Sequence, residues 1–252
     1  YIEDEYVNSD IATFAAEKAI ASAGIDKETL DYIIVAHNFG DVKHGDTRVD
    51  IVPALASRVK YKLGILNPFT IANDVPFGCP GWLQALIQAN YFIKSGDAKN
   101  ILVIGSETLS RVSDPHDRDS MIYSDGAGAV VVSAVESEEP VGILTHVTRT
   151  DTAEQVFLLQ MGKSFNPEKS DELYLKMNGR KLYEYALKTV PAAIKMAIDK
   201  SGLPITDIER ILIHQANEKM DDAIVNRLYE LFGIKDRTEF SMPMTISLLG
   251  NN

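Results

Sequence analysis

Cysteine is nearly absent from this sequence, which has Cys79 alone among 252 residues. A single cysteine can form no intrachain disulfide and cannot build a cysteine-rich zinc site. Long apolar runs are missing too, because the longest, around 127–135, has about half of the roughly 18 residues that a membrane span needs. Residues 1–6 are acidic and show no signal-peptide pattern. These absences predict a cytoplasmic protein that binds no membrane.

Positive charge is also scarce, with 25 Lys and Arg against 36 Asp and Glu and a formal net charge of −11. General nucleic-acid binding needs a basic face, so the charge balance excludes nucleic acid as a partner. An acidic protein partner would be repelled at long range unless a local basic patch receives it. The 45% hydrophobic content is typical of a folded globular protein.

Short apolar segments alternate with longer helical patterns along the chain. We expect helices over 9–23, 47–62 and 79–94, and strands over 31–36, 69–72, 101–105 and 127–134. In the first helix, Ser9 is the expected N-cap, Ile11, Phe14, Ala15 and Ala19 follow at helical spacing, and Gly24 ends the pattern. Strands that alternate with long helices predict an α/β protein.

An internal repeat suggests how this α/β protein is organised. The segment 23–38 recurs as 201–217, and the glycines and strands of the two copies share one ungapped offset of 178, since Gly24 corresponds to Gly202 (202 − 24) and Ile33 to Ile211 (211 − 33). The repeat predicts two related half-domains and a second buried strand over 208–213. The same offset moves Asn73 to 251, so we expect the sequence to be a fragment that lacks one helix and two strands of its second half.

Cys79 is the first candidate for chemistry, because it lies between a predicted strand and a predicted helix. Gly78 and Gly81 flank it and permit a tight turn, while Pro80 suits the first turn of a helix. The unpaired amides and partial positive charge at a helix N-terminus stabilise a thiolate. We therefore expect the pKa of Cys79 to lie below that of a free thiol.

Polar residues follow two other predicted strand ends. His214 comes directly after the strand over 208–213, and Asn251 follows Gly250 at the position that the repeat assigns to a strand end. The glycine-containing run 125–129 lacks the spacing of a phosphate loop and predicts tight backbone packing. The charged run 114–119 has no zinc spacing, so we expect a solvated loop and no metal site.

Together these segments resemble the thiolase-fold condensing enzymes, most closely the β-ketoacyl-acyl-carrier-protein synthase III family. The matching stretches are 78–81, 94–107, 114–118, 125–129, 214–217 and 250–251. The resemblance implies a thiolase-like fold of duplicated α/β halves in αβαβα layers, incomplete at both ends. It assigns 1–140 to the half that carries the nucleophile and 141–252 to a truncated half that carries His and Asn.

The resemblance implies a decarboxylating Claisen condensation that starts fatty-acid synthesis. Cys79 would be the nucleophile that takes the acyl group of an acyl-CoA primer, and His214 and Asn251 would complete the catalytic triad. Malonyl-acyl-carrier protein would lose CO2, and the enolate would attack the acyl-cysteine to give β-ketoacyl-acyl-carrier protein.

The resemblance also implies the substrate contacts and the partners. Arg118, Gly179 and Asn217 would contact pantetheine, Lys219 and Arg227 would dock the acidic carrier protein, and Val52 and Trp82 would line the acyl pocket. Val52 stands where the family often has a Phe that closes the acyl pocket of the partner subunit, which suggests room for a longer or aromatic primer. We expect a homodimer with CoA and phosphopantetheine thioesters as substrates, and no bound cofactor.

Two alternatives stay open. One is a specialised relative that uses the same triad to make a polyketide, an alkylresorcinol or a polyene lipid, which the departures Pro80 and Trp82 permit. The other is a catalytically silent thiolase-fold subunit that only dimerises with an active partner. Such a subunit would be expected to lose its nucleophile, whereas Cys79 is present.

Overall fold

The computed structural model describes residues 1–169, 171–235 and 242–251, which form two compact units. Unit 1 comprises Tyr1–Ser113 and Tyr123–Glu138, and unit 2 comprises Asp114–Ile122 and Glu139–Asn251. The assignment of 1–140 and 141–252 to two thiolase halves stays a prediction. No helix of the described residues is long and apolar enough to cross a bilayer.

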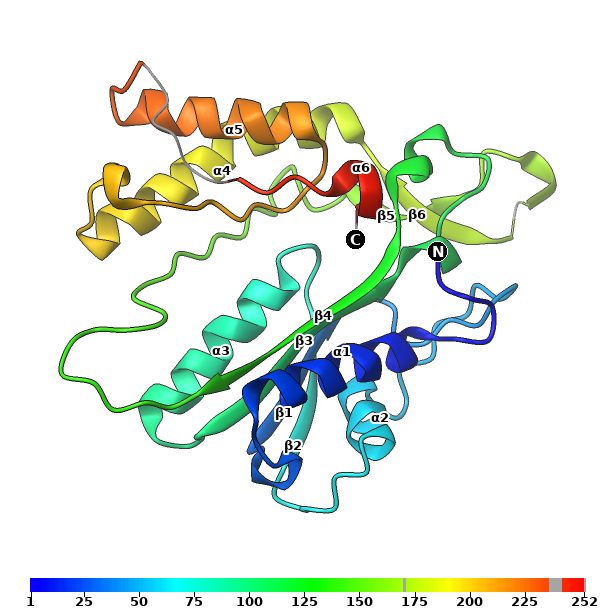
Figure 1. Ribbon diagram of the computed structural model, residues 1–252. Helices are drawn as coiled ribbons and strands as arrows, with labels where there is room; N and C mark the ends of the chain where they lie inside the picture. Colours follow the sequence, from blue (N-terminus) through cyan, green and yellow to red (C-terminus); the bar gives the residue numbers. More distant parts are fainter. Residues whose placement is uncertain (170, 236–241, 252) are drawn as a thin grey trace. The chain divides into compact units, whose positions relative to one another are not determined.

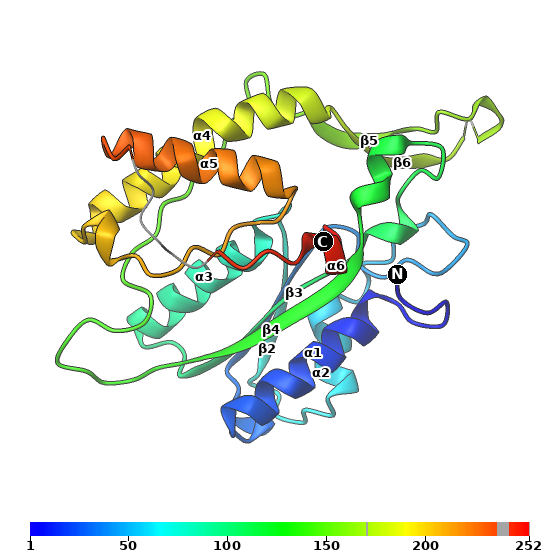
Figure 2. The same cartoon turned by 45° about the horizontal axis from the view of Figure 1, so that its top comes forward.

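Unit 1 is built on a four-stranded sheet in the order β2-β1-β3-β4 (Figure 1). The strands are β1 (Tyr32–His37), β2 (Ile71–Pro76), β3 (Asn100–Thr108) and β4 (Asp125–Ser133). β1 pairs in parallel with both β2 and β3, whereas β4 runs antiparallel to β3 at one edge of the sheet (Figure 2). The four expected strands are confirmed, although β2 extends to Pro76, beyond its predicted end.

Helices cover both faces of this sheet (Figure 1). They are α1 (Asn8–Ala23), α2 (Leu55–Lys62) and α3 (Gly81–Ser95). Ile33 and Val35 of β1 pack with α1 and α2, while Ile34 and Ala36 pack with α3. Because successive side chains of a strand point to opposite faces, the uninterrupted apolar run of β1 fills both halves of the core.

The details of α1 differ from the prediction. Val7 is the N-cap, and its amide donates to the Asp10 carboxylate at 3.0 Å. Ser9 lies inside the helix, where its amide and hydroxyl both donate to Asp41. The buried face carries Ala12 and Ala16, and Phe14 is exposed. Long-range bonding to Asp41 thus decided the role of Ser9, which its local sequence could not show.

The prediction of a helix over 47–62 was wrong in its first half, since α2 begins only at Leu55. Pro53 has no backbone N–H, and Asp50 pairs with Asp41 through two backbone hydrogen bonds of 3.0 Å. Residues 47–54 therefore form part of a loop between β1 and α2.

Unit 2 contains a two-stranded hairpin and a pair of long helices (Figure 1). Its elements are β5 (Leu159–Lys163), β6 (Leu173–Met177), α4 (Gly179–Ser201), α5 (Glu218–Leu231) and the short α6 (Ile246–Leu249). Ile198 of α4 packs with Val225 and Leu228 of α5, together with Ile205 from the intervening turn.

The internal repeat is visible in local structure. Gly24 and Gly202 end their helices with positive φ angles of 65° and 75°. The 3₁₀ turns that follow, Lys27–Thr29 and Ile205–Asp207, keep the offset of 178 (205 − 27). The strand predicted over 208–213 is not formed. In unit 1 the first copy, β1, pairs with both β2 and β3.

Candidate active site

The carboxyl ends of three parallel strands define the candidate site in unit 1. In register, His37 at the end of β1 lies opposite Pro76 of β2, and Ala36 lies opposite Gly105 of β3. Residues that follow these ends therefore gather at one edge of the sheet, where α/β proteins bind their ligands. Cys79 follows β2 by three residues (79 − 76) and precedes α3 by two (81 − 79).

The thiol of Cys79 is not activated by its position in unit 1. Cys79 is exposed, yet the protein atoms around it remove enough water to raise the pKa of its thiol, and the Glu107 carboxylate raises it further. The prediction of a lowered pKa was therefore wrong. Desolvation and a nearby negative charge both disfavour the thiolate, and here they outweigh the backbone hydrogen bond that favours it.

Glu107 is a site residue that the sequence analysis did not select. It lies near the carboxyl end of β3, is buried, and accepts from the Asn38 amide at 2.7 Å and from the Asn38 side chain at 3.3 Å. Burial raises the pKa of Glu107, and the hydrogen bonds from Asn38 oppose that shift. A glutamate just beyond the apolar segment 101–105 was the available sequence signal.

A second buried polar pair supports the same sheet edge. His37 Nε2 lies 2.9 Å from Asp74 Oδ2, and His37 Nδ1 accepts from the Gly40 amide at 3.0 Å. Asp74 also accepts from the Leu55 and Ala56 amides at 2.7 Å each, at the first turn of α2. Burial alone would raise the pKa of Asp74, but His37 and the two amides lower it. Asp74 therefore joins β1, β2 and α2.

Close backbone packing explains Gly81, two residues after Cys79. A Cβ on Gly81 would lie 3.1 Å from the Ala36 Cβ, so α3 approaches β1 as closely as glycine allows. A Cβ on Gly105 would lie 3.1 Å from the Trp82 Cβ. Trp82, predicted for the acyl pocket, thus packs over β3 in the first turn of α3 and keeps about a third (36%) of its surface exposed.

In unit 2, one side chain links the segments that carry His214 and Asn251. Gln215 Nε2 donates to the Pro243 carbonyl at 2.9 Å, and Gln215 Oε1 accepts from the Thr245 amide at 2.6 Å. Thr245 directly precedes α6, after which Asn251 follows. His214 keeps exposed surface, and the protein atoms around its ring lower its pKa. A histidine with a lowered pKa is uncharged near neutral pH.

The charged run 114–119 is not the solvated loop that we expected. Asp114 is fully buried and accepts from Lys176 Nζ at 2.5 Å, from Ser164 Oγ at 2.9 Å and from the Phe165 amide at 2.9 Å. Asp117 also accepts from Lys176, at 2.9 Å. Lys176 of β6 and the residues that follow β5 come from distant parts of the sequence, so Asp114 and Asp117 form ion pairs inside unit 2, while Arg118 and Asp119 stay exposed.

This loop brings three predicted site residues into one region of unit 2. Arg118 is exposed in the loop, and a Cβ on Gly179 would lie 3.7 Å from the neighbouring Asp119 carboxylate. The amide of Asn251, which is buried, donates to the Ile122 carbonyl at 2.9 Å. Gly179 and Asn251 therefore both lie close to residues 119–122, next to Arg118.

The remaining predicted residues of unit 2 lie on α5. Asn217 is its N-cap, and the Asn217 side chain accepts from the Met220 amide at 2.9 Å. Lys219 is exposed, whereas Arg227 pairs with Glu230 at 2.7 Å. The helix also carries Glu218, Asp221 and Asp222, so the expected basic patch is limited to single side chains.

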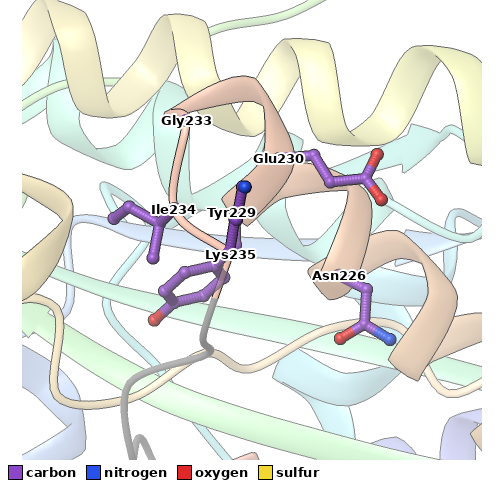
Figure 3. Close-up of a pocket in the computed structure, with 6 residues that line it drawn as sticks. All are labelled: Asn226, Tyr229, Glu230, Gly233, Ile234 and Lys235. Atoms are coloured by element: carbon purple, nitrogen blue, oxygen red, sulfur yellow. The ribbon is translucent and has the colours of Figure 1, made fainter.

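A pocket at the end of α5 contains none of these residues. It is lined by Asn226, Tyr229, Glu230, Gly233, Ile234 and Lys235 (Figure 3).

The other predicted acyl-pocket residue, Val52, lies in unit 1 on the loop that precedes α2 and is 81% exposed.

Sequence and structure comparisons give one consistent result. A family model for 3-Oxoacyl-[acyl-carrier-protein (ACP)] synthase III matches residues 73–152. The chain is 35% identical over 225 residues to a Beta-ketoacyl-[acyl-carrier-protein] synthase III of Streptococcus pneumoniae, a match that covers 87% of this chain and 65% of the relative. The chain is therefore similar to synthase III enzymes along most of its length.

Solved synthase III structures share the fold. The enzyme from Pseudomonas aeruginosa PAO1 matches with a TM-score of 0.81 and 27% identity, over 100% of this chain and 72% of that chain. The enzyme from Thermus thermophilus matches with a TM-score of 0.78 and 29% identity, over 99% of this chain and 72% of that chain. The predicted thiolase-like α/β fold is confirmed. The chain spans 65% of the length of the curated relatives that it matches.

Proposed function

We propose that the full-length protein catalyses the decarboxylating condensation of an acyl-CoA primer with malonyl-acyl-carrier protein, the reaction that initiates fatty-acid synthesis. The position of Cys79 carries the proposal. Cys79 lies within the segment that matches the family model, between the end of β2 and the first turn of α3. A nucleophile there faces the sheet edge at which parallel strands end.

In the first step, Cys79 Sγ attacks the thioester carbonyl of the primer. The new S–C bond replaces the bond to CoA, and the thiol proton leaves with the CoA thiolate as free CoA. Because its surroundings raise the pKa of Cys79, the resting residue is a thiol. The Cys79 amide, close to the N-terminus of α3, is the proposed donor to the developing oxyanion.

In the second step, malonyl-acyl-carrier protein loses CO2 and forms an enolate. An uncharged His214 and the Asn251 amide group are the proposed donors to the enolate oxygen, and the lowered pKa of His214 supports its uncharged form. The enolate carbon attacks the acyl-cysteine carbonyl, which releases β-ketoacyl-acyl-carrier protein and the Cys79 thiolate. That thiolate then regains a proton.

Partner and location are part of the same proposal. The homodimer is supported by β2, which forms an edge of the sheet, and by the exposed apolar side chains Val49, Ile51, Phe69 and Ile71 on or near it. The exposed Lys219 supports contact with the acidic carrier protein. A cytoplasmic location is supported by Cys79, which a reducing compartment would keep available for acylation.

Intact-mass measurement of the full-length protein with a panel of acyl-CoAs tests the proposal. We expect a mass gain equal to one acyl group, and no gain for Cys79→Ala. Acyl transfer onto the variant, or none onto the folded wild type, contradicts the proposal, and the second result favours a silent subunit. Product analysis with malonyl-acyl-carrier protein distinguishes a fatty-acid starter from a specialised lipid or polyketide.

A further inference from the structure

Glu107 and Cys79 lie on the same side of the sheet of unit 1, the side that α3 covers. Successive residues of a strand point to opposite faces, and Val103 of β3 packs in one cluster with α3. Gly105 continues this face, because a Cβ there would lie 3.1 Å from the Trp82 Cβ. Glu107 is the next residue of β3 on that face. It therefore lies beyond Trp82, toward the N-terminal end of α3 that Cys79 precedes.

The neighbouring strand β1 gives the same placement. A Cβ on Gly81 would lie 3.1 Å from the Ala36 Cβ, so α3 begins close to Ala36. Asn38 follows Ala36 by two residues, and its amide and side chain donate to Glu107 Oε2 at 2.7 and 3.3 Å. Asn38 therefore holds the carboxylate just beyond the first residue of α3, near the turn that carries Cys79.

Glu107 and Cys79 both lie where the protein displaces water. Burial raises the pKa of the Glu107 carboxyl, and the hydrogen bonds from Asn38 oppose that shift. Desolvation also raises the pKa of the Cys79 thiol, and the Glu107 carboxylate raises it further. Because like charges repel, the pair carries one negative charge more readily than two. In the resting protein that charge belongs to Glu107, since a carboxyl is a stronger acid than a thiol.

A second carboxylate at this sheet edge is a poorer proton acceptor. Burial would raise the pKa of Asp74, but His37 and the two α2 amides lower it. His37 pairs with Asp74 at 2.9 Å and also lowers the pKa of Glu107. On the other side of β3, Gly126 of β4 lies opposite Glu107 and adds no charge. Of the two carboxylates, Glu107 is thus the stronger base.

We propose that Glu107 is the acid–base partner of Cys79 in acyl transfer, an inference that rests on the proposed function. As Cys79 Sγ attacks the primer thioester, its S–H bond breaks and the proton passes to the Glu107 carboxylate, directly or through one water molecule. The new S–C bond forms and the bond between the acyl carbon and the CoA sulfur breaks. Glu107 gives the proton to that sulfur, so free CoA leaves and the carboxylate is restored.

This transfer removes the obstacle that the same carboxylate creates. An ionised Glu107 opposes a thiolate at Cys79, but a protonated Glu107 does not. The negative charge therefore moves from oxygen to sulfur, and no second charge is buried. After condensation releases the Cys79 thiolate, a proton taken up from water returns to the sulfur by the same route.

The test uses the full-length protein and compares two reactions of Cys79 at the same pH. Alkylation by iodoacetamide needs only the thiolate. Acylation is measured as kcat/KM with the acyl-CoA that reacts fastest with the wild type among chains of two to eight carbons. The variants are Glu107→Gln, Glu107→Asp and the control Glu17→Gln, at an exposed position on α1. Thermal unfolding of each variant is recorded in parallel.

We expect Glu107→Gln to accelerate alkylation and to slow acylation by about 100-fold, which is within the contribution of a positioned acid–base group. Removal of a charge alone would accelerate both reactions. The acylation rate of the wild type should level off above the pKa of Glu107, whereas that of Glu107→Gln should rise until the thiol ionises. Glu107→Asp, which keeps a carboxylate, should recover part of the acylation rate, and Glu17→Gln should change neither reaction.

A second variant keeps the inference testable if Glu107→Gln does not fold. Asn38→Ala retains the carboxylate but removes a side-chain donor that lowers the pKa of Glu107. The pH at which the acylation rate levels off should therefore move upward in Asn38→Ala. A levelling pH that stays unchanged or moves downward would contradict the inference.

The outcomes separate the inference from the function. If Glu107→Gln changes alkylation and acylation in the same direction, or changes neither, Glu107 transfers no proton in the reaction. The inference is then wrong, while acylation of Cys79 stands. If no acyl-CoA acylates the folded wild type, the proposed function fails and the inference fails with it.

Discussion

Lys176 Nζ lies 2.5 Å from Asp114 Oδ2, and the carboxylate is fully buried in unit 2. Burial opposes the charge of both groups, but their mutual hydrogen bond lowers the pKa of Asp114 and raises that of Lys176. Lys176 also pairs with Asp117 and lies over the Phe165 ring, 3.8 Å from its centre. The pair therefore ties the loop that carries Arg118 to strand β6.

Lys176→Met should destabilise the protein strongly, because it leaves the Asp114 charge buried without its cation. We expect a loss of about 3 kcal/mol in the free energy of unfolding, measured by denaturant titration. The control Lys169→Met removes an exposed pair with Glu172 and should cost less than about 1 kcal/mol. A lowered folded pKa means that the stability from Asp114 is present above its unfolded pKa and is lost as the pH falls. Equal effects of the two variants would contradict the prediction.

Gly179→Ala should impair substrate binding without harming the fold. The added Cβ would lie 3.7 Å from both the Asp119 carboxylate and the Met177 Cε, which is ordinary contact, and alanine favours a helix more than glycine does. If pantetheine passes over this backbone, the methyl group should raise KM for the CoA primer by about tenfold, or roughly 1.4 kcal/mol. The melting temperature should stay equal or rise. An unchanged KM would remove Gly179 from the substrate path.

Glu107→Gln should make Cys79 more reactive at neutral pH. The Glu107 carboxylate raises the pKa of the thiol, so its removal should lower that pKa and increase the thiolate fraction. The rate of alkylation by iodoacetamide, followed from pH 6 to 10, should reach its midpoint at a lower pH and be severalfold faster at pH 7. Glu17→Gln, at an exposed position on α1, should leave the profile unchanged. A midpoint that stays or moves upward would contradict the electrostatic role of Glu107.

Asp221→Asn should stabilise the protein at neutral pH. Asp221 is fully buried in α5, neither of its carboxylate oxygens has a hydrogen-bond partner among the described residues, and burial together with Asp222 raises its pKa to about 6. Because the folded pKa exceeds the unfolded value, Asp221 favours folding at low pH and loses that contribution as the pH rises through about 6. The variant should gain about 1 kcal/mol at pH 7.5, with little gain at pH 4.5.

The matched control for that measurement is Glu230→Gln on the same helix. Glu230 pairs with Arg227 at the surface, so its loss should change stability by less than about 1 kcal/mol at either pH. A gain for Asp221→Asn that does not depend on pH would show that the ionised carboxylate is not the source of the instability.

Elements governed by neighbouring residues were predicted well. β1 is a continuous apolar run, α3 starts two residues after Cys79, and Gly24 and Gly202 end their helices with positive φ. Each of these depends on side-chain periodicity or on one backbone conformation, which a short segment specifies by itself. The prediction of a strand over 208–213 was wrong, because a strand also needs hydrogen bonds to a neighbouring strand, which a short segment does not specify.

Buried charge was predicted poorly. Asp114 and Lys176 are 62 residues apart in the sequence, and Arg58 and Asp41 are 17 apart. In the sequence alone, each of these four charged residues is indistinguishable from an ordinary surface residue. Whether a charged group is solvated or internally paired depends on elements that the fold brings together, and no local periodicity encodes that choice.

The order of residues alone determined the α/β class and the place of Cys79 between a strand and a helix, because these follow from local periodicity and from helix-capping residues. Tertiary structure decided the acidity of the Cys79 thiol at that position. The pKa of Cys79 is raised, not lowered, because β3 brings Glu107 near it and the surrounding chain displaces water. Desolvation and Coulomb interactions depend on distance in space, and that distance exists only after folding.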